Sequence, residues 1–303
     1  DVCSSDLIKA GTWVIGMLGS FTDADYVASL ESAGLVGVGI EKLPRQLSSA
    51  QSMDEMTSQN SVMGYKAAIT AADAYGSFLP MMTTAAGTIR PAKALVLGAG
   101  IAGLQAIGTL KRLGAVVTAY DVRPASQGEV ESLGAKFLDL GLDFSKGQGE
   151  GGYARALSAE EQAQQQAAVD EKAAGFDIII TTAKVPGRKP PVLLTAAGVK
   201  GLKRGAVIVD CAASDLGGNV EGSAVGEQVT KGGVKLIGAP YLASGVATTA
   251  SNLLSRNVAD ILVHFVRDGK LGQDLTEELD DALVVAGRAA APAAAADAEK
   301  SEK

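Results

Sequence analysis

The stretch Ala94-Leu-Val-Leu-Gly98-Ala-Gly100-Ile-Ala-Gly103 carries the glycine spacing of a turn that binds dinucleotides. An apolar run precedes Gly98 and predicts a buried strand, while apolar residues recur at helical spacing from Leu104 to Leu113. At such a strand-to-helix turn the first glycine allows the tight bend, the second lets a pyrophosphate approach the backbone, and the third permits close packing. We therefore expect a dinucleotide to be bound by the turn residues Gly98, Gly100, Ile101, Ala102 and Gly103.

An acid follows at the spacing that this fold requires. Asp121 stands 18 residues after Gly103, directly behind the strand predicted at 115–120. A carboxylate at this place accepts hydrogen bonds from the adenosine ribose, and its charge repels a 2′-phosphate. We therefore predict NAD(H) as the cofactor of this chain, against the alternative that the glycines serve packing alone.

Apolar runs and helical patterns alternate along most of the chain. Strands are predicted at 12–18, 35–40, 94–97, 115–120, 136–140, 177–180, 206–209 and 234–237, and helices near 23–32, 61–75, 104–113, 127–132, 158–174 and 250–266. The segment 84–91 contains Gly87 and Pro91 and is expected to be a linker. Alternation at this spacing predicts an α/β fold with a doubly wound parallel sheet.

The alternation indicates two Rossmann-like domains, of which the smaller is incomplete. We expect a partial N-terminal α/β domain at 1–60, completed by about 245–285, and an NAD(H)-binding Rossmann domain at 61–244. The alanine-rich stretch at 286–303 is expected to be a disordered tail. Residues 1–7 resemble the translation of a sequencing adapter, so Cys3 is expected not to be native.

Composition excludes several classes of function. The 303 residues carry 27 Lys and Arg against 34 Asp and Glu, and this net charge of −7 argues against nucleic acid as a partner. Apolar runs stay shorter than the about 18 residues of a membrane span, so direct membrane insertion is not expected. Cys3 and Cys211 offer no metal spacing, and the single histidine, His264, excludes a histidine-rich metal site. His264 comes late in an apolar helical segment and is predicted to be a helix-end residue.

Three further segments follow predicted strands, where open α/β sheets bind their ligands. They are 146–153, 181–191 and 210–219. The second begins with Thr181 and holds Thr182 and Ala183. The first is rich in glycine and contains Tyr153, which fits either a mobile lid over a bound cofactor or a solvated linker.

Several motifs outside the glycine turn occur in the order of one known family. They are Arg45 with Ala50-Gln-Ser-Met-Asp54, Gly64-Tyr-Lys-Ala, Thr84-Ala-Ala-Gly87, Tyr120-Asp-Val-Arg123, Gly151-Gly-Tyr-Ala154, Thr181-Thr-Ala and Gly217-Gly-Asn219. Together with the glycine turn they resemble the NAD(H)-binding domain I of the alpha subunit of proton-translocating NAD(P) transhydrogenase, from about Leu7 to Gly272. That family is related to alanine dehydrogenase. The resemblance implies two α/β domains separated by a cleft, and an N-terminal truncation of this chain.

The resemblance also implies an activity and a set of site residues. Hydride would pass between NADH on this chain and NADP(H) on a partner domain, coupled to proton movement through a membrane-spanning domain. Catalytic roles beside the nicotinamide would fall to Arg45, Gln51 and Asp54, with Thr57 near the carboxamide. Cofactor contacts would come from Asp121, Val122, Arg123, Tyr153, Thr182 and Ala183. The implied assembly is a homodimer in the cytoplasm, peripheral on the inner face of the bacterial plasma membrane through its partner subunits.

Two other functions remain open from the residues. An alanine dehydrogenase would need a Lys and a His acting on its substrate, and no His precedes His264 in this chain. A non-catalytic NAD-binding module would need only the glycine turn and Asp121. Hydride transfer requires positioning rather than an acid or a base, so a transhydrogenase needs no catalytic His.

Overall fold

The structure is a computed structural model and describes residues 8–142, 157–184, 189–230 and 232–288. The chain divides into two compact units, which are described separately. The first unit comprises residues 1–58 and 251–303, and the second comprises residues 59–250. The chain enters the second unit within helix α2 (Glu55–Ala74) and leaves it within helix α7 (Ala247–His264).

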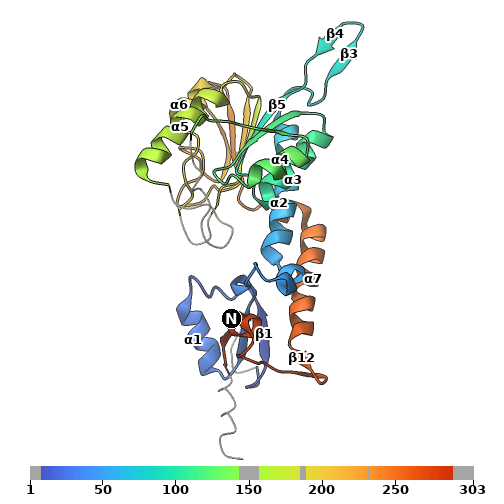
Figure 1. Ribbon diagram of the computed structural model, residues 1–303, viewed down its shortest axis with the longest axis vertical. Coiled ribbons are helices and arrows are strands. Elements are labelled where there is room, and N and C mark those ends of the chain that lie inside the picture. Colours follow the sequence, from blue (N-terminus) through green and yellow to red (C-terminus); the bar gives the residue numbers. More distant parts are fainter. Residues whose placement is uncertain (1–7, 143–156, 185–188, 231, 289–303) are drawn as a thin grey trace, which may run out of the picture. The chain divides into compact units, whose positions relative to one another are not determined.

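A seven-stranded sheet with the order β10-β11-β9-β8-β5-β6-β7 forms the centre of the second unit (Figure 1). Six strands are parallel: β5 (Lys93–Leu97), β6 (Val116–Tyr120), β7 (Lys136–Phe137), β8 (Ile178–Thr181), β9 (Val207–Asp210) and β11 (Lys235–Gly238). From β5 the chain builds outward to β6 and β7, and then returns to the other side of β5 with β8. The strand order therefore reverses between β5 and β8, and the carboxyl ends of these strands form the switch point where such sheets bind ligands.

Helices cover both faces of this sheet. Ala94 and Val96 of β5 point toward one core, which α2, α3 (Ile101–Arg112) and α4 (Ser126–Ser132) complete. Leu95 and Leu97 point toward the other core, which α5 (Ala159–Ala173) and α6 (Ala196–Gly201) cover. Because both faces are buried, the central strands are continuous apolar runs, and this explains why they could be identified from the sequence. The expected doubly wound α/β fold is confirmed.

Three local expectations for this unit were wrong. The segment 84–91 is largely not a linker, because β3 (Met82–Thr84) and β4 (Gly87–Ile89) form a hairpin that extends away from the sheet in Figure 1. The sheet is not wholly parallel, since β10 (Gly226–Val229) pairs antiparallel with β11 at one edge. β10 was missed because an exposed edge strand needs no apolar run. The strand expected at 136–140 is limited to the two residues of β7.

The first unit is built on a three-stranded sheet with the order β1-β2-β14. β1 (Trp13–Gly16) and β2 (Val36–Gly39) are parallel, and β14 (Val284–Ala286) runs antiparallel to β2. The shorter elements of this unit are α1 (Ala24–Ser32), η2 (Ile40–Lys42), η3 (Ser48–Met53), β12 (Val266–Arg267), β13 (Lys270–Leu271) and α8 (Glu278–Leu283), while η5 (Leu242–Val246) belongs to the second unit. The core contains Ile261, Phe265 and Leu283, and the ring of Trp13 packs 5.1 Å from that of Phe265. No helix in the described ranges is both long and apolar enough to cross a membrane.

Candidate functional site

The glycine turn joins β5 to α3, and packing requires two of its three glycines. Gly98 has φ +98°, and a Cβ there would lie 2.7 Å from Thr182 Oγ1. A Cβ on Gly103 would lie 1.9 Å from the carbonyl oxygen of Gly98, so any side chain would push α3 off the strand. The hydroxyl of Thr182 also donates to the Gly98 carbonyl at 3.0 Å, which ties the loop after β8 to the turn.

Gly100 is different, because the space beside it is open. The nearest atom to a Cβ on Gly100 is Arg123 Nη2, at 4.0 Å. Gly100 is the N-cap of α3 and provides no side chain to cap the helix, so the first N–H groups of α3 lack a side-chain acceptor. An uncapped helix N-terminus behind an open glycine suits a pyrophosphate, whose negative charge the helix dipole favours.

Asp121 follows β6 and is held against this turn by four hydrogen bonds. Its Oδ2 accepts from the N–H of Ala99 at 2.8 Å and from Arg123 Nη2 at 3.0 Å. Its Oδ1 accepts from the N–H of Arg123 and from Arg123 Nε, both at 2.9 Å. The carboxylate side chain is 8% exposed and the guanidinium side chain 22%. The hydrogen bonds from Arg123 to Asp121 raise the pKa of the guanidinium above its usual value, so the ion pair persists throughout the physiological range.

The loops after β8 and β9 are joined by two buried polar side chains. Asp210 accepts from Thr181 Oγ1 at 2.9 Å and from the N–H groups of Ala212 and Val220 at 2.9 and 3.2 Å. Asn219 Nδ2 donates to the carbonyls of Ala183 and Pro191, both at 2.8 Å. Sequence reasoning selected these loops but missed the structural part of Asp210. The available signal was a charged residue directly behind four apolar strand residues.

A close helix crossing supports the turn and was also missed. A Cβ on Gly64 of α2 would lie 2.0 Å from the carbonyl oxygen of Ala102 in the first turn of α3. The backbones of the two helices therefore approach at Gly64, and only glycine fits there. From the sequence, Gly64 was noted as part of a motif, with no physical reason for its being glycine.

Three of the residues expected beside a nicotinamide meet in the first unit. Arg45 Nε pairs with Asp54 Oδ2 at 2.9 Å, and Arg45 Nη2 donates to Thr57 Oγ1 at 3.1 Å. Asp54 Oδ1 accepts from the N–H of Thr57 at 2.8 Å, the bond by which an acid caps a helix. Gln51 lies on η3, and its side chain is exposed and outside this cluster.

The cap at Asp54 corrects one predicted boundary. Helix α2 begins at Glu55 and not near Ser61, because Asp54 satisfies an N–H of its first turn. The polar composition of 47–57 concealed this start. Asp54 therefore has a structural task in addition to any contact with a cofactor.

Glu55 is a buried acid next to this cluster. It is 6% exposed, and burial, followed in importance by the charge of Asp54, raises its pKa to about 7. Sequence reasoning did not select Glu55, because a charged residue in the first turn of a helix usually faces solvent.

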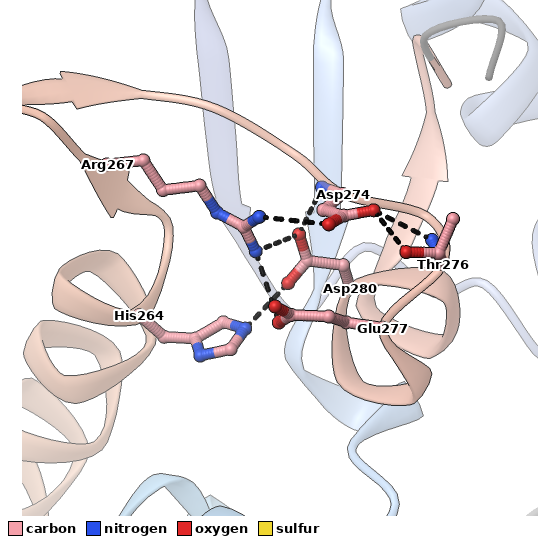
Figure 2. A network of polar contacts seen from close by, with 6 residues as sticks. All are labelled: His264, Arg267, Asp274, Thr276, Glu277 and Asp280. Carbon is pink, nitrogen blue, oxygen red and sulfur yellow. Dashed lines mark hydrogen bonds and ion pairs between the residues drawn. The ribbon is translucent and has the colours of Figure 1, made fainter. Parts of the chain in front are cut away.

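His264 ends α7, as the sequence predicts, and belongs to a polar network around the fully buried Asp280 (Figure 2). His264 Nε2 lies 2.6 Å from Asp280 Oδ1, and Asp280 Oδ2 accepts from Arg267 Nη2 at 2.9 Å and from the N–H of Asp274 at 2.6 Å. His264, Asp280 and Glu277 place ligand atoms within 4.8 Å of one another. Arg267 also pairs with Glu277 at 3.2 Å, so a cation already balances both acids, and the network is structural.

The remaining predicted residues fall in different places. Val122 lies between Asp121 and Arg123 in the turn after β6, and Ile101 and Ala102 begin α3. Thr182 and Ala183 follow β8. Tyr153, the candidate lid residue, lies outside the described residues.

Comparison with known proteins agrees with this site. Residues 67–290 match the family model described as alanine dehydrogenase/PNT, C-terminal domain. The first of the parts that make up NAD(P) transhydrogenase subunit alpha of Rickettsia prowazekii is 42% identical over 271 residues, which cover 89% of this chain and 70% of that protein. The protein of the same name from Rhodospirillum rubrum is 42% identical over 280 residues, covering 92% of this chain and 72% of that protein. The crystal structure of transhydrogenase from Sinorhizobium meliloti superposes with a TM-score of 0.79 at 39% identity, covering 94% of this chain and 77% of that chain. The chain therefore belongs to the alanine dehydrogenase/PNT family and, within it, to the alpha subunits of NAD(P) transhydrogenase.

Proposed function

We propose that this chain is the NAD(H)-binding component of a proton-translocating NAD(P) transhydrogenase, and that it passes hydride between NADH and NADP(H) held by a partner domain. The observation that supports this most is the turn between β5 and α3. There, Gly100 leaves open space before an uncapped helix N-terminus, and Asp121 stands beside it. These features suit a pyrophosphate and an adjacent ribose, and the group to be bound is therefore NAD(H).

The residues of this chain would bind and orient the cofactor rather than exchange protons with it. When bound, the nicotinamide ring supplies or receives the hydride. The N–H groups at the start of α3 would hold the pyrophosphate, and Asp121 would orient the adenosine ribose. By resemblance, Arg45, Gln51 and Asp54 would fix the nicotinamide, with Thr57 near its carboxamide. The mutual bonds of Arg45, Asp54 and Thr57 keep these groups rigid, which favours a fixed approach geometry for hydride transfer.

We further propose the partners that the family implies. They are an NADP-binding domain and a membrane-spanning proton-translocating domain, which would hold this chain at the cytoplasmic face of a bacterial plasma membrane. The names of the relatives describe them as one piece of a divided alpha subunit, which supports the existence of other pieces. A homodimer is proposed from the same resemblance, and the exposed Met81 and Ile89 of the β3–β4 region offer apolar surface for it.

A hydride-transfer assay tests the proposal directly. We expect NADH to reduce an NADP analogue when this chain is mixed with an NADP-binding transhydrogenase component, and no oxidation of NADH by pyruvate and ammonium alone. Gln51→Ala should lower the transfer rate far more than NADH affinity, because its contact matters for positioning. Gln164→Ala, which changes an exposed glutamine of α5, is the matched control. Turnover of pyruvate and ammonium without a partner would establish alanine dehydrogenase instead, and NADH binding without any transfer would leave a binding module.

A further inference from the structure

The carboxylate of Asp121 has no acceptor position to spare. A carboxylate offers about four lone-pair sites. Four N–H donors meet them here: one from Ala99, the backbone N–H of Arg123, and Nε and Nη2 of the Arg123 guanidinium. A ribose that binds Asp121 must therefore displace or share the guanidinium bonds, because the two backbone donors belong to the turn itself.

The guanidinium of Arg123 lies next to the open side of the glycine turn. Its Nη2 is the nearest atom to the position of a Cβ on Gly100. In dinucleotide-binding folds an arginine near the ribose accommodates a 2′-phosphate, and the planar guanidinium matches phosphate geometry. The turn of this chain thus contains both the acid typical of an NAD(H) site and the cation typical of an NADP(H) site.

We propose that Arg123 determines nucleotide selectivity together with Asp121, and that Asp121 suppresses a latent 2′-phosphate site by holding the Arg123 guanidinium in a bidentate pair. Repulsion of a 2′-phosphate by Asp121 is then half of the effect. The other half is that Asp121 occupies the cation that would bind the phosphate. This inference rests on the proposed NAD(H) site and names the residue on which its selectivity depends.

Removal of the Asp121 charge should therefore create affinity rather than merely reduce repulsion. Asp121→Asn keeps a carbonyl oxygen for the N–H of Ala99 and turns an amide donor toward Arg123, which ends the bidentate pair. Glu129 is the other acid whose charge acts on Arg123. It is exposed, so solvent and salt screen its attraction.

The test measures binding of NADH, NADPH, 5′-AMP and adenosine 2′,5′-bisphosphate to the whole chain by calorimetry. We expect wild type to prefer NADH, and Asp121→Asn to bind adenosine 2′,5′-bisphosphate about tenfold or more tightly than wild type does. Asp121→Asn/Arg123→Ala should lose this gain, whereas Asp121→Asn/Arg112→Ala should keep it, because Arg112 lies at the far end of α3. Asp121→Ala, with and without Arg123→Ala, repeats the comparison with the acid side chain removed.

The outcomes separate this inference from the proposed function. Equal affinity of Asp121→Asn and Asp121→Asn/Arg123→Ala for adenosine 2′,5′-bisphosphate, with NADH binding intact in wild type, overturns the role of Arg123 alone. Failure of wild type to bind NADH overturns the proposed site and this inference with it. Loss of the gain in both double variants shows a general effect of positive charge and also contradicts the specific role of Arg123.

Discussion

Glu55 should make the first unit less stable as the pH rises. The side chain is 6% exposed and burial raises its pKa to about 7, from an ordinary value of 4.5. The folded state therefore keeps a proton that the unfolded chain has already lost between pH 4.5 and about 7. Because the folded state binds more protons in this window, the free energy of unfolding falls as pH increases through it, and levels off above pH 7.

The size of the effect follows from the shift in pKa. A difference of about 2.5 units, from 4.5 to about 7, corresponds to about 3 kcal/mol at pH 8, since each unit is worth about 1.4 kcal/mol. Glu55→Gln removes the titration and keeps the shape of the side chain. Its unfolding free energy relative to wild type should therefore rise by about 3 kcal/mol between pH 4.5 and pH 8.

Trp13 makes this measurement selective, because it is the only tryptophan of the chain and packs on Phe265 in the same unit as Glu55. Urea unfolding followed by Trp13 fluorescence at several pH values gives the difference between variant and wild type, in which titrations common to both cancel. Glu31→Gln, at an exposed position of α1, is the matched control and should show no change with pH. Parallel pH profiles for wild type and Glu55→Gln would refute the argument that burial holds the proton on Glu55.

Three further results are expected. Gly64→Ala should destabilise the second unit by about 3 kcal/mol or prevent its folding, because its Cβ would lie 2.0 Å from a backbone oxygen, whereas Gly128→Ala in α4 meets nothing within 4 Å and should stabilise slightly; thermal unfolding by circular dichroism distinguishes them. Asp280→Asn should lower the Trp13-detected unfolding free energy by about 3 kcal/mol, since it leaves the buried partners of the acid uncompensated, and an effect no larger than that of Asp281→Asn at an exposed site would contradict this. If Tyr153 closes over NADH, limited proteolysis within 147–155 should slow when NADH is saturating, and unchanged cleavage would favour a linker.

Local patterns determined the central part of the fold. β5, the glycine turn, α3 and β6 are consecutive in the chain, and each obeys a short-range rule of apolar periodicity or glycine spacing. The strands of the sheet are buried on both faces, so their apolar runs are visible without any knowledge of their partners. The place of Asp121 follows from the same local geometry. These features could be predicted because the residues responsible for them are close together in the sequence.

Contacts between distant residues were decided by the tertiary structure alone. Gly64 must be glycine because of the carbonyl of Ala102, and nothing near Gly64 in the sequence indicates that contact. Arg45 meets Thr57 only because Asp54 starts α2 earlier than its polar surroundings suggest.

The edges and polar details of the fold were likewise beyond the sequence. β10 pairs at the sheet edge through its backbone, so its side chains carry no apolar pattern. The guanidinium of Arg123 fills the acceptor positions of Asp121, which the spacing of the acid could not reveal. The sequence alone therefore determined the fold class and the cofactor turn, because periodicity and glycine spacing act over a few residues. The three-dimensional packing decided which polar groups meet in the site, because those meetings depend on how separate elements are brought together.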